Sequence, residues 1–64
     1  MIDEFTGMEI RPIAEAPKDG SVILGLANGS TYIKAQWGGS SWIYAGGGTR
    51  EDCSPQPQQW LKEL

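Results

Sequence analysis

The side chains with which this chain could carry out chemistry are few. Its 64 residues include no His and a single Cys, Cys53. Catalytic pairs of Ser or Cys with His are therefore excluded, as are an internal disulfide and a zinc site of the usual ligands. Cys53 follows Glu51 and Asp52, and their charges disfavour the thiolate that a reactive cysteine needs. We expect a free, unreactive thiol in an exposed loop.

Acidic pairs and a glycine run are the other candidates for a site. Glu15 with Asp19, and Glu51 with Asp52, are the two carboxylate clusters. A glycosidase places its acids on two sides of a cleft, for which a chain of this size has little room, so we interpret both pairs as solvated surface. The glycines at 46–48 lack the Lys and the Ser or Thr of a phosphate loop. The sequence thus predicts a protein that is not an enzyme and that needs no metal or cofactor.

The elements that would position any site lie in the middle of the chain. Two β-like runs, 21–27 and 30–37, are separated by Asn28-Gly29, the preferred pair of a type I′ hairpin turn. A second turn at Gly39-Ser40 leads into a third run over 41–45. These runs and turns predict a three-stranded antiparallel meander.

The turns also predict which side chains share a face. A two-residue turn at Asn28-Gly29 would place Gly25 opposite Tyr32 on the outer face, and the second turn would pair Trp37 with Trp42. The inner face would then consist of Val22, Leu24, Leu26, Ile33, Ala35, Trp37, Trp42 and Tyr44.

The ends of the chain are predicted to complete this fold. Residues 1–7 resemble a frayed leader, residues 8–11 a short edge strand, and residues 12–16 one helical turn. Residues 46–57 are predicted to form a mobile loop, and residues 58–64 fit a short helix or a final strand equally well. Three strands with one apolar face are about the minimum that is stable in water, so Ile10, Ile13, Trp60 and Leu61 must supply a lid. We predict one mainly β domain, a small antiparallel meander of three to five strands that could close into an SH3-like barrel, lidded by its N- and C-terminal segments.

Charge and hydropathy restrict the partners. The net charge is −3, with five scattered cations, too few to neutralise a phosphate backbone, so we expect no direct contact with nucleic acid. No apolar run approaches the ~18 residues that cross a membrane. The acidic first residues do not resemble a secretory signal, and a lone thiol suits a reducing compartment, so we expect a cytoplasmic protein. A basic partner, or mimicry of an acidic ligand, stays open.

One surface could carry a protein partner. Tyr32 is predicted on the outer face, where aromatic side chains often anchor interfaces, although it could simply fill the gap beside Gly25. The candidate partner-binding residues are Ile23, Tyr32, Lys34, Ile43, Glu51 and Asp52.

Several short blocks occur in a characteristic order. Arg11-Pro12-Ile13 precedes Ala16-Pro17-Lys18-Asp19-Gly20, two runs carry Trp37 and Trp42, and Pro57-Gln58-Gln59-Trp60-Leu61 follows. This order resembles a group of short uncharacterised proteins from bacteriophages and prophages, catalogued as a domain of unknown function. Its members commonly read Ala-Pro-Lys-Asp-Gly, a later Trp and a final Pro-Thr-His-Trp-Met-Pro-Leu-Pro. The resemblance covers residues 11–61 and implies a mobile-element origin and a small β fold, with no activity attached.

Two departures limit what this resemblance implies. The group's Thr-His before the last Trp is Gln58-Gln59 here, and its Pro-Leu-Pro tail is replaced by Lys62-Glu63-Leu64. Any role of that His in metal binding or proton transfer therefore does not carry over to this chain.

Our leading hypothesis is a non-enzymatic phage or prophage protein that binds a host protein in the host cytoplasm and inhibits or redirects it. Host-defence inhibitors such as anti-CRISPR proteins are typically small and acidic, as this chain is. The alternative is a structural or assembly module, or a homodimeric accessory protein that pairs through the edge at 8–11 or through the third strand.

Overall fold

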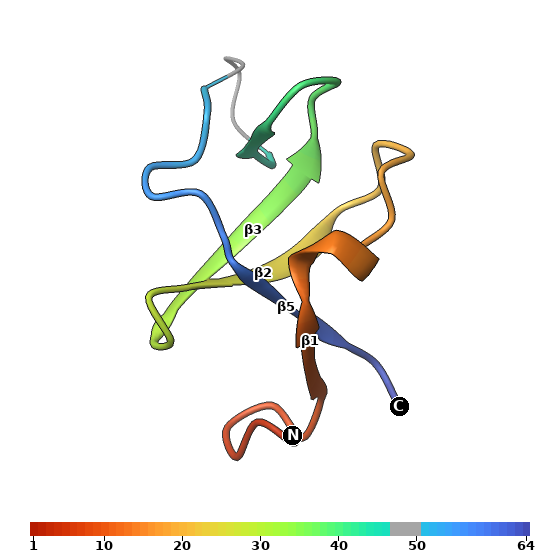
Figure 1. Cartoon of the computed structure of the whole chain (residues 1–64), viewed down its shortest axis with the longest axis vertical. Helices are drawn as coiled ribbons and strands as arrows, with labels where there is room; N and C mark the ends of the chain where they lie inside the picture. The colour runs from red at the N-terminus through yellow and green to blue at the C-terminus, as the bar shows by residue number, and fades with distance from the viewer. Residues whose placement is uncertain (47–50) are drawn as a thin grey trace.

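Five short antiparallel strands form one open sheet in the computed structural model of the chain, which describes residues 1–46 and 51–64. The strands are β1 (Glu9–Pro12), β2 (Ile23–Ala27), β3 (Thr31–Trp37), β4 (Trp42–Tyr44) and β5 (Gln59–Lys62), and a 3₁₀ turn, η1 (Ile13–Glu15), follows β1. Their order across the sheet is β1-β5-β2-β3-β4 (Figure 1). The predicted mainly β, antiparallel fold is confirmed, and the sheet is open rather than closed into a barrel.

The C-terminal segment enters the sheet as β5, between β1 and β2. Leu61 lies opposite Ile10 on one side and opposite Leu24 on the other. A strand in this position finds hydrogen-bonding partners along both of its edges, which a helix there would forgo. Of the two alternatives for residues 58–64, the strand is correct. The edge strand and the single helical turn predicted near the N-terminus are also present, as β1 and η1.

The β2–β3 hairpin is present, but its register differs from the prediction by one residue. The loop consists of three residues, Asn28-Gly29-Ser30, rather than two. Ile23 lies opposite Ala35, and Gly25 lies opposite Ile33. Because side chains alternate between the faces of a sheet, a shift of one residue turns every side chain of β2 over.

This shift corrects the predicted faces of β2. We call the face that carries Ile23, Ala35 and Trp42 the inner face, and the face that carries Leu24 and Lys34 the outer face. Ile23, predicted outside, is buried in the inner core. Val22, Leu24 and Leu26, predicted inside, follow the opposite alternation. The inner side of β2 is therefore lined partly by Gly25 and Ala27, whose small size leaves room for the aromatic side chains of other strands.

The β3–β4 hairpin has the predicted register. Trp37 lies opposite Trp42 and Ala35 opposite Tyr44. The two indole rings meet edge to face, with centroids 5.2 Å apart and planes at 69°, a favourable geometry for aromatic pairs. Lys18, from the loop before β2, lies over the Trp37 ring at 4.5 Å.

The inner core gathers side chains from nearly the whole length of the chain. The partly buried Trp37, Tyr44, Trp60 and Ile13 pack against it. Its buried members are Ala16, Ile23, Ala27, Ile33, Ala35, Trp42 and Cys53. Of the predicted lid, Ile13 and Trp60 do pack on this face, whereas Ile10 and Leu61 lie on the outer face, in one paired row with Leu24. Ala16 and the segment that contains Cys53 complete the cover.

Gly25 is the closest point between the sheet and that C-terminal segment. A Cβ atom at Gly25 would lie 2.8 Å from the Pro57 Cβ and 3.3 Å from its Cγ. Carbon atoms do not approach this closely, so the Pro57 ring can occupy its position only because residue 25 has no side chain.

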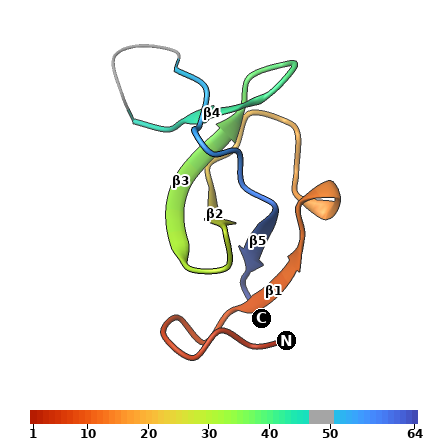
Figure 2. The same cartoon turned by 60° about the vertical axis from the view of Figure 1, so that its left-hand side comes forward.

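Residues 1–7 fold back on the sheet instead of fraying. Ile2 forms a β-bridge with Glu9, and the Asp3 carboxylate accepts a hydrogen bond of 2.8 Å from the Tyr32 hydroxyl of β3. The leader is thus tied to both β1 and β3, and it lies at one end of the molecule, close to the start of β1 (Figure 2). Leu26 and Leu61 lie on the outer face and are only 3% and 2% exposed, so apolar side chains are buried on this face as well as in the inner core.

The predicted mobile loop is anchored where the structure describes it; its residues 47–50 lie outside the described part of the chain. The Tyr44 N–H donates to the Glu51 carbonyl at 2.9 Å, and the Cys53 N–H donates to the Trp42 carbonyl at 2.9 Å. The Gln56 amide bonds both backbone groups of Trp42, at 2.9 and 2.8 Å. Residues 51–56 therefore pair with β4 as an additional strand would.

The contact between Gly25 and Pro57 predicts an asymmetry between substitutions. Gly25→Ala should lower the free energy of unfolding by about 1–3 kcal/mol, the usual cost of overpacking a core. The loss of stability should persist in a Pro57→Ala background, because alanine at position 57 keeps the Cβ atom that clashes with a side chain at residue 25. It should largely disappear in a Pro57→Gly background, which lacks that atom. Urea denaturation of the two double-mutant cycles measures this coupling. An equal cost in both backgrounds would show that the clash with Pro57 is not its cause.

Candidate functional site

An open groove lies at the start of β2 and the end of β5, where residues of the outer face meet Pro17, Ile23 and Trp60. Its volume is about 520 Å³, within the range of about 300–1,000 Å³ that ligand sites usually span. Apolar side chains form most of its wall. The lining includes Met8, Val22, Leu24, Lys34, Leu61 and Lys62.

The groove lies along a row of residues paired across neighbouring strands, which continues beyond the groove to Ile10 of β1. Lys34 lies opposite Leu24, Leu24 opposite Leu61, and Leu61 opposite Ile10. Paired residues of an antiparallel sheet point to the same side and lie about 4.5–5.5 Å apart. Val22, two residues before Leu24, extends the apolar surface and is 59% exposed. The groove therefore presents a continuous aliphatic strip with an ammonium group at one end.

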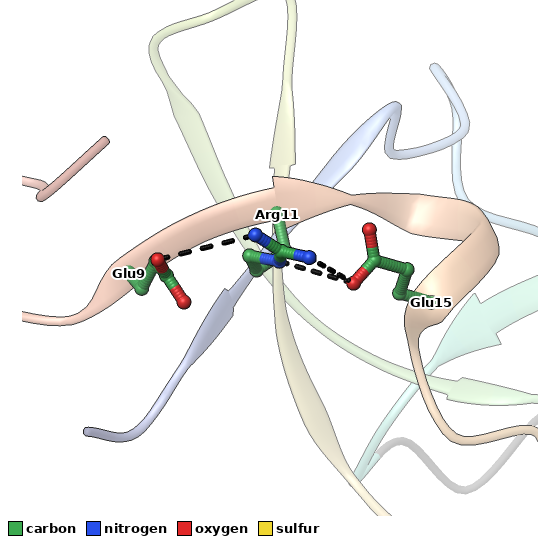
Figure 3. A network of polar contacts seen from close by, with 3 residues as sticks. All are labelled: Glu9, Arg11 and Glu15. Atoms are coloured by element: carbon green, nitrogen blue, oxygen red, sulfur yellow. Dashed lines mark hydrogen bonds and ion pairs between the residues drawn. The ribbon is translucent and has the colours of Figure 1, made fainter.

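Two lysines give the groove a local positive charge in an acidic chain. Within residues 1–46 and 51–64, neither Lys34 nor Lys62 forms an ion pair. Arg11 differs, because its guanidinium lies 4.0 Å from the Glu9 carboxylate and bonds Glu15 through both Nε and Nη2 (Figure 3). The hydrogen bond and charge of Glu15 raise the pKa of Arg11. Within the described residues, Lys34 and Lys62 are thus lysines of the groove that can meet an anionic group, although Glu63 of the same lining offsets part of their charge.

The hydroxyl of Tyr32 is already hydrogen-bonded within the chain. It lies opposite Leu26, not Gly25, so it does not fill a gap beside a glycine. Its hydroxyl donates to Asp3 Oδ1, while Asp3 Oδ2 accepts hydrogen bonds from the Thr6 N–H at 2.9 Å and the Thr6 hydroxyl at 2.8 Å. The hydrogen bond from Tyr32 is the main reason that the pKa of Asp3 is lowered, and the same bond raises the pKa of Tyr32. Tyr32, 40% exposed, holds the leader to the sheet.

The structure separates the residues that the sequence predicted as one surface. Lys34 lines the groove and is exposed. Ile23 also lines the groove, but it belongs to the inner core and is only 6% exposed. Ile43 lies opposite Gln36 as predicted but is also 6% exposed, because the segment around Asp52 runs alongside β4. Ile23 and Ile43 are therefore not available to a partner on this surface.

The predicted acidic contacts lie at the other edge of the sheet. Glu51 and Asp52 are exposed beyond β4, and Asp52 accepts a hydrogen bond of 2.7 Å from the Ser41 hydroxyl. They lie on the far side of β4, whereas the groove is lined from β5, β2 and, through Lys34, β3. Any contact that they make belongs to a different surface.

Cys53 is buried, which corrects the prediction of an exposed thiol. It is 3% exposed and belongs to the inner core. Burial is the larger cause of its raised pKa, and the charge of Asp52 adds to it. A raised pKa disfavours the thiolate, as the sequence led us to expect. Its main cause, however, is desolvation rather than the charge of the neighbouring acids. The other acidic pair does not act as a unit either, because Glu15 bonds Arg11 while Asp19 bonds Ser21.

Most of the groove was missed by the sequence reasoning. Val22 and Leu24 were assigned to the inner face by the wrong register, and Leu61 and Lys62 belonged to a segment whose secondary structure was undecided. The sequence did carry one signal for this part of the sheet. If residues 59–62 are paired with β1 as a strand, Ile10 and Leu61 fall on the same face.

Comparisons with protein families, with characterised proteins and with solved structures gave no match for this chain. Within the described residues, no group of three or more Cys, Asp or Glu side chains is placed to hold a metal ion. The same part of the chain contains no helix with the length and apolar character needed to cross a membrane.

The burial of Cys53 predicts a thiol that reacts slowly in the native protein. With an aromatic disulfide reagent at neutral pH, we expect modification at least about 100-fold slower than in the urea-unfolded chain, because reaction needs exposure and the thiolate. The release of the coloured thiol measures both rates. Equal rates in the two states would contradict the buried position of Cys53.

The lowered pKa of Asp3 predicts a dependence of stability on pH. A carboxyl group whose pKa falls on folding stabilises the protein above its unfolded value, here 3.8, and this contribution is lost as the pH drops through the folded pKa. The difference in Tm between the wild type and Asp3→Asn should therefore be largest near neutral pH and shrink as the pH falls below 3.8.

Asp19→Asn serves as the control, because the pKa of Asp19 is also lowered, by Ser21, without any link to the leader. Amide hydrogen exchange separates the two variants. Protection of Asp3 and Gly7, whose N–H groups are hydrogen-bonded in the leader, should be lost in Asp3→Asn and kept in Asp19→Asn. The account of the leader is wrong if both variants retain that protection.

Proposed function

We propose that this chain is a non-enzymatic protein-binding module whose groove holds an apolar segment of a partner protein. The observation that carries the proposal is the accessible apolar surface formed by Leu24 and the 59% exposed Val22, with Lys34 and Lys62, which form no ion pair in the described residues, beside it. A buried aliphatic contact would supply the affinity, and the lysines would favour a segment that also bears a carboxylate.

The available side chains support a binding role over a catalytic one. The sequence contains no His, and the thiol of Cys53 is buried with a raised pKa. The chain therefore offers no activated nucleophile of its own in the part that the structure describes. Nothing in the groove besides lysines and one acid, Glu63, could exchange a proton.

The resemblance to phage and prophage proteins supports a host protein as the partner. In this proposal the chain acts in the cytoplasm of the host cell and inhibits or redirects its target by covering the site that the target needs. The block at 16–20 and the Trp at 60 carry that resemblance, and they are packing elements here, since Ala16 is in the inner core and Trp60 packs against it.

The edges of the sheet make strand addition a less favourable route to assembly. In the described residues, Ile2 is bridged to Glu9 on the free side of β1, and Asp52 is bridged to Ile43 on the free side of β4. Occupied edges do not offer the unpaired backbone groups on which strand addition depends. A structural or homodimeric role through these edges would require one of the two segments to leave.

Site-specific photo-crosslinking tests the groove directly. A photoreactive phenylalanine analogue replaces Val22 in one variant and the exposed Ala14 of η1 in a control, and each is irradiated in host lysate. The proposal predicts a specific crosslinked protein from position 22 alone. With that protein purified, Val22→Glu should weaken binding by about tenfold or more, while Ala14→Glu should not. The proposal is wrong if position 14 crosslinks the same protein equally well, or if both variants bind like the wild type.

A further inference from the structure

The leader presents an aromatic side chain on a closed loop. Phe5 is 88% exposed and stands at the tip of the turn formed by residues 3–8, which we call the leader loop. The Asp3 N–H donates to the Met8 carbonyl and the Gly7 N–H donates to the Asp3 carbonyl, both at 2.8 Å. Gly7 has φ of 73°, a backbone conformation that glycine adopts without strain.

The Asp3 side chain fixes this loop from within and ties it to the sheet. One carboxylate oxygen accepts two hydrogen bonds from Thr6, and the other accepts the bond from Tyr32. These bonds hold the loop in shape while Phe5 stays 88% exposed. Presenting a large apolar side chain on a preformed loop reduces the entropy lost on binding.

The chemistry around Phe5 complements that of the groove. Glu4 is next to it, exposed, and has no ion pair within the described residues. The groove offers the opposite combination, an apolar strip with the unpaired ammonium groups of Lys34 and Lys62. Phe5 does not enter the groove of its own chain, as its exposure shows. The occupant that this complementarity favours is therefore the leader loop of another copy.

We propose that the chain forms a symmetric dimer in which Phe5 of each copy enters the groove of the other and Glu4 meets Lys34 or Lys62. Both features belong to the outer face, because the leader loop is bonded to Tyr32, which lies two residues from Lys34 on the same side of β3. A two-fold axis between two such faces makes every contact twice, as symmetric dimers require. The inference rests on the proposed function only in taking the groove as a binding surface.

A regulatory consequence follows for the proposed partner. The second copy and an apolar segment of another protein would compete for the same groove, so dimerisation would lower the apparent affinity for that protein. The segment that displaces the dimer should resemble the leader loop, with a carboxylate next to an aromatic or aliphatic side chain. The homodimer expected here uses the face of the sheet and leaves both edges as they are.

Sedimentation equilibrium of the full chain tests the dimer. We expect the wild type to be dimeric well below about 1 mM, and Phe5→Ala to raise the dimer dissociation constant by about 100-fold, because each dimer loses two buried rings. Leu64→Ala is the matched control, since Leu64 is equally exposed, at 84%, but lies outside the leader loop. It should leave the dissociation constant unchanged. Dimers that form equally well from Phe5→Ala and Leu64→Ala would overturn the proposal.

A charge exchange tests the ionic part of the same contact. Glu4→Lys and Lys34→Glu should each weaken the dimer, and the double variant should recover most of the loss if Glu4 meets Lys34; the same exchange with Lys62 covers the other pairing. The arrangement is contradicted if neither double variant recovers the affinity of the dimer. A wild type that stays monomeric up to about 1 mM also overturns the proposed dimer. The proposed function is tested separately, by the crosslinking comparison of positions 22 and 14.

Discussion

The close approach of Pro57 to Gly25 is the constraint on which the remaining structure depends. The ring of Pro57 lies against the backbone of β2 at a distance that no side chain on residue 25 would allow. Gly25 must therefore face inward, and alternation then places Ile23 and Ala27 in the inner core and Leu24 on the outer face. A chain of 64 residues without a disulfide cannot form a thick core, so this choice decides which apolar side chains remain at the surface.

The outer face follows from the same constraint. With Leu24 and Leu26 turned outward, a second apolar surface forms, and the bond of Asp3 to Tyr32 holds the leader against part of this face. The part around Leu24 and Val22 stays open and becomes the groove. The candidate site is thus the portion of the second apolar face that the chain does not cover itself, and the leader that is held against one portion also carries the aromatic side chain that fits the other.

The elements that could be predicted from sequence are those decided by local chemistry. The β3–β4 register follows from Gly39-Ser40 and the two tryptophans, and η1 and β1 follow from short local patterns. The β2–β3 register could not be obtained in this way, because Asn28-Gly29 is compatible with a loop of two or three residues and the decision rests on Pro57, about thirty residues away. Of the predicted partner-binding residues, Lys34 alone lines the groove as an exposed side chain, since the others were chosen on the shifted register or on a loop at the far edge.

Nuclear Overhauser effects between β2 and its neighbours test this account most directly. The account predicts contacts of the Leu24 backbone and side chain with Lys34 on one side and Leu61 on the other, and contacts of the Pro57 ring with the Gly25 α-protons. A spectrum that instead places Leu24 opposite Ile33, with Gly25 opposite Tyr32, would contradict it, because the groove would then be lined by different residues and Pro57 would have no position against the sheet.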